Sequence, residues 1–206
     1  MTARRVGLGC VALVLAACTI GRVESTPFEG PAPSAILVLP PVSLREGLVM
    51  DLRGFAYGAE RAIAERGYRA LPLGAGFDLA QRCGALTGDQ PEPDALQRLQ
   101  QQVGVDAVLR IEISAWEVEP GARFSGASWD VTWRLLSTES GVVLWQHRLQ
   151  GNWRKVAEMP DHLRRDEMEP QPALIGGTRP QSFASERELV FALHRSALSR
   201  MPESVR

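Results

Sequence analysis

The chain has 206 residues, of which 45% are hydrophobic, and its 23 Lys and Arg nearly balance its 24 Asp and Glu, giving a formal net charge of −1. This balance, without a basic cluster, argues against a nucleic-acid-binding protein, because such proteins concentrate positive charge on one face. The length suits one domain of ordinary size.

The first 17 residues have the features of a secretory signal. Arg4 and Arg5 precede an apolar run at residues 6–17. A helix needs about 20 residues to span a bilayer core, so this run is too short for a transmembrane helix. We predict that residues 1–17 are a signal peptide.

The sequence at residues 15–18, Leu-Ala-Ala-Cys, resembles a bacterial lipobox, the motif at which a diacylglyceryl group is attached to the cysteine before signal peptidase cuts in front of it. The resemblance implies that Cys18 is the lipidated first residue of the mature protein. Thr19 replaces the aspartate that usually retains such proteins in the inner membrane, which implies the outer membrane. The alternative is an ordinary secretory signal with an incidental cysteine.

Residues 18–33 are predicted to be the lipidated cysteine and a tether. They contain Pro27, Pro31 and Pro33 and little apolar content. Extended at about 3.1 Å per residue, the segment after Cys18 would reach roughly 45 Å, which keeps the domain near its membrane.

A domain is predicted over residues 34–203, and its first half alternates strands and helices. The predicted elements are a strand over 34–42, a helix over 50–67, a strand over 68–73 and a helix over 95–104. Pro40 and Pro41 are expected to end the first strand, and Asp94 to cap the second helix. Residues 74–76, Gly-Ala-Gly, are expected to form a turn.

The second half of the domain predicts antiparallel strands and a closing helix. Apolar and polar residues alternate over 105–118, 129–135 and 143–149, and Ser185 and Glu188 form a capping box for the helix. The fold class is therefore α/β: a single domain with a mixed five-stranded sheet in the order β-α-β-α-β-β-β-α. The helices are expected to pack on one face, leaving the other face polar.

Between the last strand and the last helix, residues 154–182 form a polar stretch with no sustained period. It is long for a loop inside a compact domain. We predict an excursion that binds a partner or is partly disordered.

Four segments resemble, in order and spacing, a family of small proteobacterial lipoproteins of poorly defined function. They are AILVLPPV, ERGYRALP, LQQQVGVDAVLRIEISAWE and STESGVVLWQHRLQGNW, which lie within residues 34–153. The family is related in fold to the N-terminal domain of TolB and to curli-secretion lipoproteins. The resemblance implies an envelope lipoprotein of an assembly or transport system, with other envelope lipoproteins or outer-membrane proteins as partners and without established catalysis.

Catalytic and metal-binding motifs are weakly supported. His147, His162 and His194 are scattered, without the close spacing to Cys, Asp or Glu that metal sites favour. No Gly-x-Ser-x-Gly motif is present. We therefore expect no metal, no cofactor and no enzymatic activity, although a hydrolytic pair at the polar residues Ser43 and Glu46 is an alternative.

Two candidate partner-binding surfaces follow from the pattern. The first is the loop rim after the parallel strands, with Pro40, Pro41, Pro72 and Trp116. The second is the polar sheet face, with Arg110, Arg134, Arg148 and Glu112. Three arginines would suit an acidic partner, whereas the alternative is that these charges only pair with each other.

The remaining features are the single cysteine of the domain and the tryptophans. Cys83 shares a helical face with Leu79 and Leu86, which predicts a buried, inert thiol, with an intermolecular disulfide as the alternative. All five tryptophans lie between Trp116 and Trp153, as core residues or as a platform for stacking sugars.

The function predicted from the sequence is therefore a periplasm-facing, outer-membrane lipoprotein that acts as a non-enzymatic adaptor and possible homo-oligomer. A lipoprotein that binds cell-wall glycan or a small ligand is the alternative.

Overall fold

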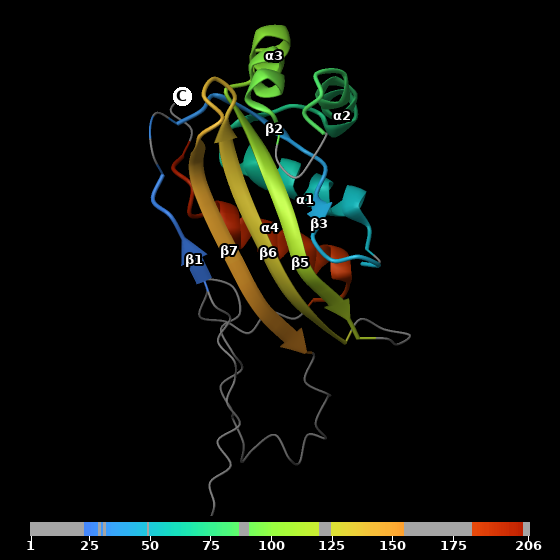
Figure 1. The fold of residues 1–206 in the computed structure, drawn as a ribbon. Helices are drawn as coiled ribbons and strands as arrows, with labels where there is room; N and C mark the ends of the chain where they lie inside the picture. The colour runs from blue at the N-terminus through green and yellow to red at the C-terminus, as the bar shows by residue number, and fades with distance from the viewer. Residues whose placement is uncertain are drawn as a thin grey trace, which may run out of the picture.

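A computed structural model describes residues 23–28, 30, 32–48, 50–86, 91–119, 125–154 and 183–203. A mixed seven-stranded sheet runs through these residues in the order β1-β7-β6-β5-β2-β4, and β3 also pairs with β5 (Figure 1). The strands are β1 (Val23–Ser25), β2 (Ala35–Val38), β3 (Val42–Ser43), β4 (Arg69–Ala70), β5 (Ala107–Val118), β6 (Gly126–Ser137) and β7 (Val143–Arg154). The helices are α1 (Leu52–Glu65), α2 (Leu73–Arg82), α3 (Pro93–Val103) and α4 (Glu186–Leu198).

The alternating pattern of the second half produces three antiparallel strands of 12 residues each, β5, β6 and β7. Their pairing skips Ser114, because Ile113 lies opposite Val131 and Ala115 lies opposite Asp130. This β-bulge reverses the alternation that follows it. Trp116 therefore faces the same side of the sheet as Ile113, although an unbroken strand would turn it to the other side.

The predicted first strand ends at Val38, just before Pro40 and Pro41, and a second short strand, β3, follows the prolines. β2 pairs with β5 in parallel up to Val38 opposite Leu109, and β3 resumes the same pairing with Val42 opposite Glu112. The chain uses one residue more than β5 between these two points. A proline cannot donate a ladder hydrogen bond, so β2 ends before Pro40 and Pro41, as predicted. The return of the chain to the same partner in β3 was not predicted.

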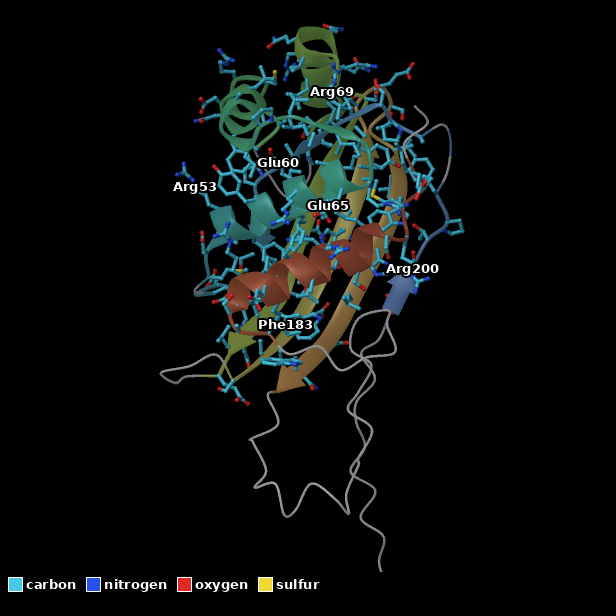
Figure 2. All side chains as sticks on the ribbon, turned by 180° about the vertical axis from the view of Figure 1, so that it is seen from behind. Arg53, Glu60, Glu65, Arg69, Phe183 and Arg200 are labelled. Carbon is cyan, nitrogen blue, oxygen red and sulfur yellow. The ribbon has the colours of Figure 1, made fainter. Side chains whose placement is uncertain are left out.

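Helices α1 and α4 lie side by side across one face of the sheet (Figure 2). Each begins at a side-chain cap: the Asp51 side chain accepts a hydrogen bond from Gly54 N at 2.9 Å, and the Ser185 hydroxyl accepts one from Glu188 N at 3.3 Å. Of the two caps, the sequence predicted only Ser185. Between them and the sheet lies the larger core cluster, which contains Phe55, Ile111, Trp133 and Leu193 among others. The α/β fold class is confirmed, and the five predicted strands are present. The sheet has seven strands instead of five, because β1 and β3 also pair in it.

Helices α2 and α3 occupy the other face, at the end of the sheet where β2 begins (Figure 1). They cover a second core cluster that includes Leu37, Leu99, Val108 and Leu136. The prediction that all helices pack on one face is therefore wrong. β2 is buried on both sides, and a strand of this kind needs apolar cover on both sides.

Two predicted details of these helices also change. Residues 74–76 lie inside α2 and form no turn. A Cβ atom at Gly76 would lie 2.4 Å from Leu37 Cδ1, so the helix needs glycine there to approach the sheet. Helix α3 begins at Pro93, one residue before the predicted cap Asp94, because proline suits the first helical position.

The strand β1 lies inside the range predicted as a tether. Val23 pairs with Leu149 and Ser25 with His147, antiparallel to β7. The reason is that β7 would otherwise expose unpaired backbone groups along its edge, and a short polar strand satisfies some of them. The tether prediction is therefore wrong for Val23–Ser25. The predicted signal peptide, and residues 155–182 of the predicted excursion, lie outside the described residues.

No helix in the described part of the chain is both long and apolar enough to cross a membrane.

Candidate functional site

The candidate site is the polar sheet face, defined as the side of β5, β6 and β7 that points away from α1 and α4. Its principal side chains are Arg110, Glu112, Asp130, Thr132, Arg134, Gln146 and Arg148. No helix of the described chain covers its middle, and it faces the viewer in Figure 1.

Glu112 is the centre of this face. Its Oε1 atom accepts a hydrogen bond from Arg110 Nε at 2.9 Å and another from Arg134 Nη1 at 2.8 Å. Arg134 also donates from Nε to Gln146 Oε1 at 2.8 Å. The side chains of Arg110 and Glu112 are only 6% and 8% exposed, so this ion pair is buried. A buried pair need not add net stability, but removing one partner leaves the other charge uncompensated.

Arg148 forms a second, separate pair across the strands. Its Nε and Nη2 atoms donate to the two carboxylate oxygens of Asp130 at 2.8 and 2.6 Å, which is the bidentate geometry that favours arginine. The pKa of Arg148 is raised, first by these hydrogen bonds and the charge of Asp130, and also by Glu24 on β1. The edge strand therefore contributes a charge to the polar sheet face.

The arginines of this face consequently pair with carboxylates of the same face. This is the alternative that the sequence left open, and it weakens the expectation of an acidic partner held by three free arginines. The sequence identified Arg110, Arg134 and Arg148 but did not pair Arg148 with Asp130. The cross-strand register, which pairs Asp130 with Gln150 and places Arg148 diagonally from it, was the missing information.

A hollow of about 560 Å³ lies at the end of the polar sheet face where β5 and β7 finish. The described residues that line it are Glu117, Val118, Glu119, Ala127, Ser128, Asn152 and Trp153. Glu117 pairs with Arg45 at 2.8 Å, and both side chains are largely exposed. The lining offers mostly hydrogen-bond acceptors and includes no histidine or cysteine among the described residues. The sequence did not predict this hollow, since its residues come from three strands.

Trp116 does not join the other residues of the predicted loop rim. Pro40 and Pro41 lie between β2 and β3, and Pro72 is the exposed residue just before α2. Trp116 is 3% exposed, and its Nε1 donates to Glu186 Oε1 at 2.8 Å in the helix-covered core. The bulge at Ser114 explains this, because it turns Trp116 inward.

All five tryptophans are core residues, with exposures of at most 5%. They are Trp116, Trp129, Trp133, Trp145 and Trp153. A platform for stacking sugars needs an exposed ring face, so the structure gives no support to that alternative.

Two of the three histidines lie in the core. His194 on α4 is fully buried, and its Nδ1 atom accepts a hydrogen bond from Trp133 Nε1 at 3.0 Å. Burial lowers the pKa of His194 to about 3, although a backbone contact with Phe55 opposes the shift. His147 stacks on Trp145, and burial, followed by the charge of Arg200, lowers its pKa. Both rings are therefore neutral packing groups near pH 7.

The remaining candidate residues are the cysteines and any metal ligands. Cys18 and His162 lie outside the described residues. Cys83 is 1% exposed and its thiol contacts Gln102 Oε1 at 3.5 Å, as expected for an inert buried thiol. Within the described ranges, no three His, Cys, Asp or Glu side chains gather in a way that could hold a metal ion.

The chain matches the model of a known protein family. The model of the GNA1162-like lipoproteins matches residues 23–159, which is more than half of the 206 residues. The chain belongs to the GNA1162-like lipoprotein family. This confirms the resemblance to small lipoproteins that the sequence segments indicated. No curated protein sequence matches the chain.

Three solved structures are similar to the chain. The PelC dodecamer from Paraburkholderia phytofirmans is 14% identical and covers 90% of this chain and 99% of its own, with a TM-score of 0.54. The lipoprotein GNA1162 from Neisseria meningitidis is 23% identical and covers 64% of this chain and 90% of its own, with a TM-score of 0.43. The LpoB C-terminal domain from Escherichia coli is 14% identical over 59% of this chain and 85% of its own, with a TM-score of 0.43. At these identities the likeness to PelC establishes the fold alone.

Proposed function

We propose that this GNA1162-like chain is a lipid-anchored envelope protein that acts as a non-enzymatic adaptor in an assembly or transport complex. The observation that carries the proposal is the family match over residues 23–159. The lipobox at residues 15–18 supports attachment through Cys18, and Thr19 supports the outer membrane with the domain facing the periplasm. Anchoring confines the domain near one membrane and so raises the effective concentration of partners held there.

The polar sheet face is the surface we assign to partner contact. It is broad, and its buried ion pairs fix the side chains before binding, which lowers the entropy lost on association. Arg134 and Arg148 are partly exposed, and Gln150 and Asn152 beyond them are exposed, so they present hydrogen-bonding groups to a partner. Arg110 is buried and holds the Glu112 carboxylate through its hydrogen bond.

Self-assembly is the partner class that one comparison supports. The PelC structure, which covers 90% of this chain, is a dodecamer. We propose that this chain also associates with copies of itself through the polar sheet face, and that the assembled form binds the other envelope components.

Cross-linking in intact cells tests the adaptor role. The native protein is compared with Cys18→Ala, which we expect to leave the membrane fraction and to lose its cross-linked partners. A Cys18→Ala protein that stays membrane-bound would show that the anchor assignment is wrong. Absence of any captured protein with the anchored form would refute the adaptor role.

A matched pair of substitutions tests the contact surface. Gln150→Arg adds bulk and charge on the polar sheet face, whereas Tyr57→Arg does so on the exposed side of α1, where Tyr57 is 57% exposed. We expect Gln150→Arg to reduce self-association in analytical ultracentrifugation and Tyr57→Arg to leave it unchanged. The reverse result would show that self-association uses the helix-covered side of the domain instead of the polar sheet face.

A further inference from the structure

The direction of β1 shows from which side the chain enters the domain. Val23 lies opposite Leu149 and Ser25 opposite His147, and Thr26 N continues by donating to Gln146 O at 2.9 Å. β1 therefore runs antiparallel to β7, from the Arg154 end of β7 toward its Val143 end. Val23 is therefore the residue of β1 that lies nearest the Arg154 end of the sheet.

The distance from Val23 to the proposed lipid attachment is short. Cys18 is five residues before Val23, and an extended chain spans at most about 3.6 Å per residue, so the two lie within roughly 18 Å. Leu149, opposite Val23, is also five residues from Arg154, which is roughly 17 Å of strand. The attachment point can thus reach the level of the Arg154 end, but not far beyond it.

The opposite end of the sheet is out of reach. There the β6–β7 hairpin packs against α3: Gln97 Nε2 donates to Glu139 O at 3.2 Å, and Gly141 lies beside Pro93. From Leu149 the chain would have to pass six residues of β7, roughly 20 Å, and then the thickness of a helix, about 10 Å. This exceeds the span available between Cys18 and Val23.

We propose that the sheet end where β5 and β7 finish lies against the lipid surface, so that α2 and α3 point away from the membrane. This inference rests on the proposed lipid attachment of Cys18. The hollow lined by Glu117, Val118 and Asn152 lies at this membrane-facing end. Its carboxylates suit a zwitterionic lipid surface better than an anionic one.

Two label positions distinguish the ends. Asn152 is exposed at the end of β7, and Val142 is 55% exposed in the hairpin beside α3. Asn152→Cys and Val142→Cys are labelled with a fluorophore in the lipidated protein, where the buried Cys83 is protected from the reagent. The proteins are bound to phosphatidylethanolamine vesicles that carry a nitroxide quencher on the headgroup.

We expect the label at Asn152 to be quenched several-fold more strongly than the label at Val142. Equal quenching, which an edge-on domain would give, or stronger quenching at Val142 would overturn the orientation. Flotation of the same samples tests the anchor separately. If the lipidated protein fails to float with the vesicles, or if the Cys18→Ala protein floats equally well, the proposed attachment fails; floating without the quenching difference overturns the orientation alone.

Discussion

The fully buried His194 predicts how the stability of the domain depends on pH. Its ring lies between Phe55 and Trp133, with centroid separations of 4.5 and 5.7 Å, and a Cβ atom at Gly58 would lie 2.8 Å from His194 Cδ2. Nδ1 already accepts a hydrogen bond from Trp133, so protonating it would break that bond and bury a charge. Acidification should therefore destabilise the fold at this residue.

The magnitude follows from the two pKa values. The pKa is about 3 in the folded protein and about 6.5 in an unfolded chain. The unfolded state thus binds more protons between these values, and stability falls as the pH falls through this window. Each pH unit costs about 1.4 kcal/mol, so His194 should account for roughly 2 kcal/mol between pH 6.5 and pH 5. The dependence levels off about one pH unit above 6.5, where His194 is neutral in both states.

Guanidinium unfolding followed by tryptophan fluorescence measures this dependence. His194→Gln keeps a hydrogen-bond acceptor but does not titrate, so its free energy of unfolding should fall about 2 kcal/mol less than that of the native protein over the same pH range. His147→Gln is the matched control for the second buried histidine, whose lowered pKa acts in the same direction. If the native protein and His194→Gln lose the same stability on acidification, the assigned role of His194 is refuted.

Two further predictions concern the polar sheet face and α2. Glu112→Gln should destabilise the fold by about 3 kcal/mol in urea unfolding, because it leaves the buried charge of Arg110 uncompensated. As the control, Glu46→Gln at an exposed position should change stability by less than about 0.5 kcal/mol. Equal effects of the two substitutions would contradict the buried ion pair. Gly76→Ala should cost about 1 to 3 kcal/mol through its clash with Leu37, whereas Gly74→Ala, with open space around it, should be neutral or stabilising by up to about 1 kcal/mol. A melting temperature unchanged by Gly76→Ala would show that α2 can move away from the sheet.

The sequence predicted those parts of the fold that depend on local pattern. The alternation of apolar and polar residues in β5, β6 and β7 predicts strands with one buried face. The apolar stripe of α4 likewise predicts a helix with one buried face. The bulge at Ser114 was not predictable, because the residue that a strand skips depends on its partner in β6. It is this one residue that moved Trp116 from a predicted rim into the core.

The two faces of β2 and the polar sheet face also depend on contacts between distant residues, which local sequence pattern does not predict. The unbroken apolar run of β2 predicted burial on both sides, yet the glycines of α2 favoured a turn when judged by propensity alone. Only the contact between Gly76 and Leu37 explains why those glycines are helical. Likewise, the sequence placed Arg148 on the polar sheet face, but its carboxylate partner Asp130 lies on a neighbouring strand.

The pairing of β1 with β7 also sets an order for making the protein. Thr26 forms a hydrogen bond with Gln146, 120 residues later in the chain. The strand β1 therefore has no partner strand until nearly three quarters of the chain has been synthesised. Such a long loop is slow to close, and the N-terminal segment must wait without its partner. The last helix, α4, then covers the large aromatic side chains of the finished sheet. A chain that ends before β7 would leave both the β6 edge and the tryptophan-rich face open, which is a species prone to aggregate.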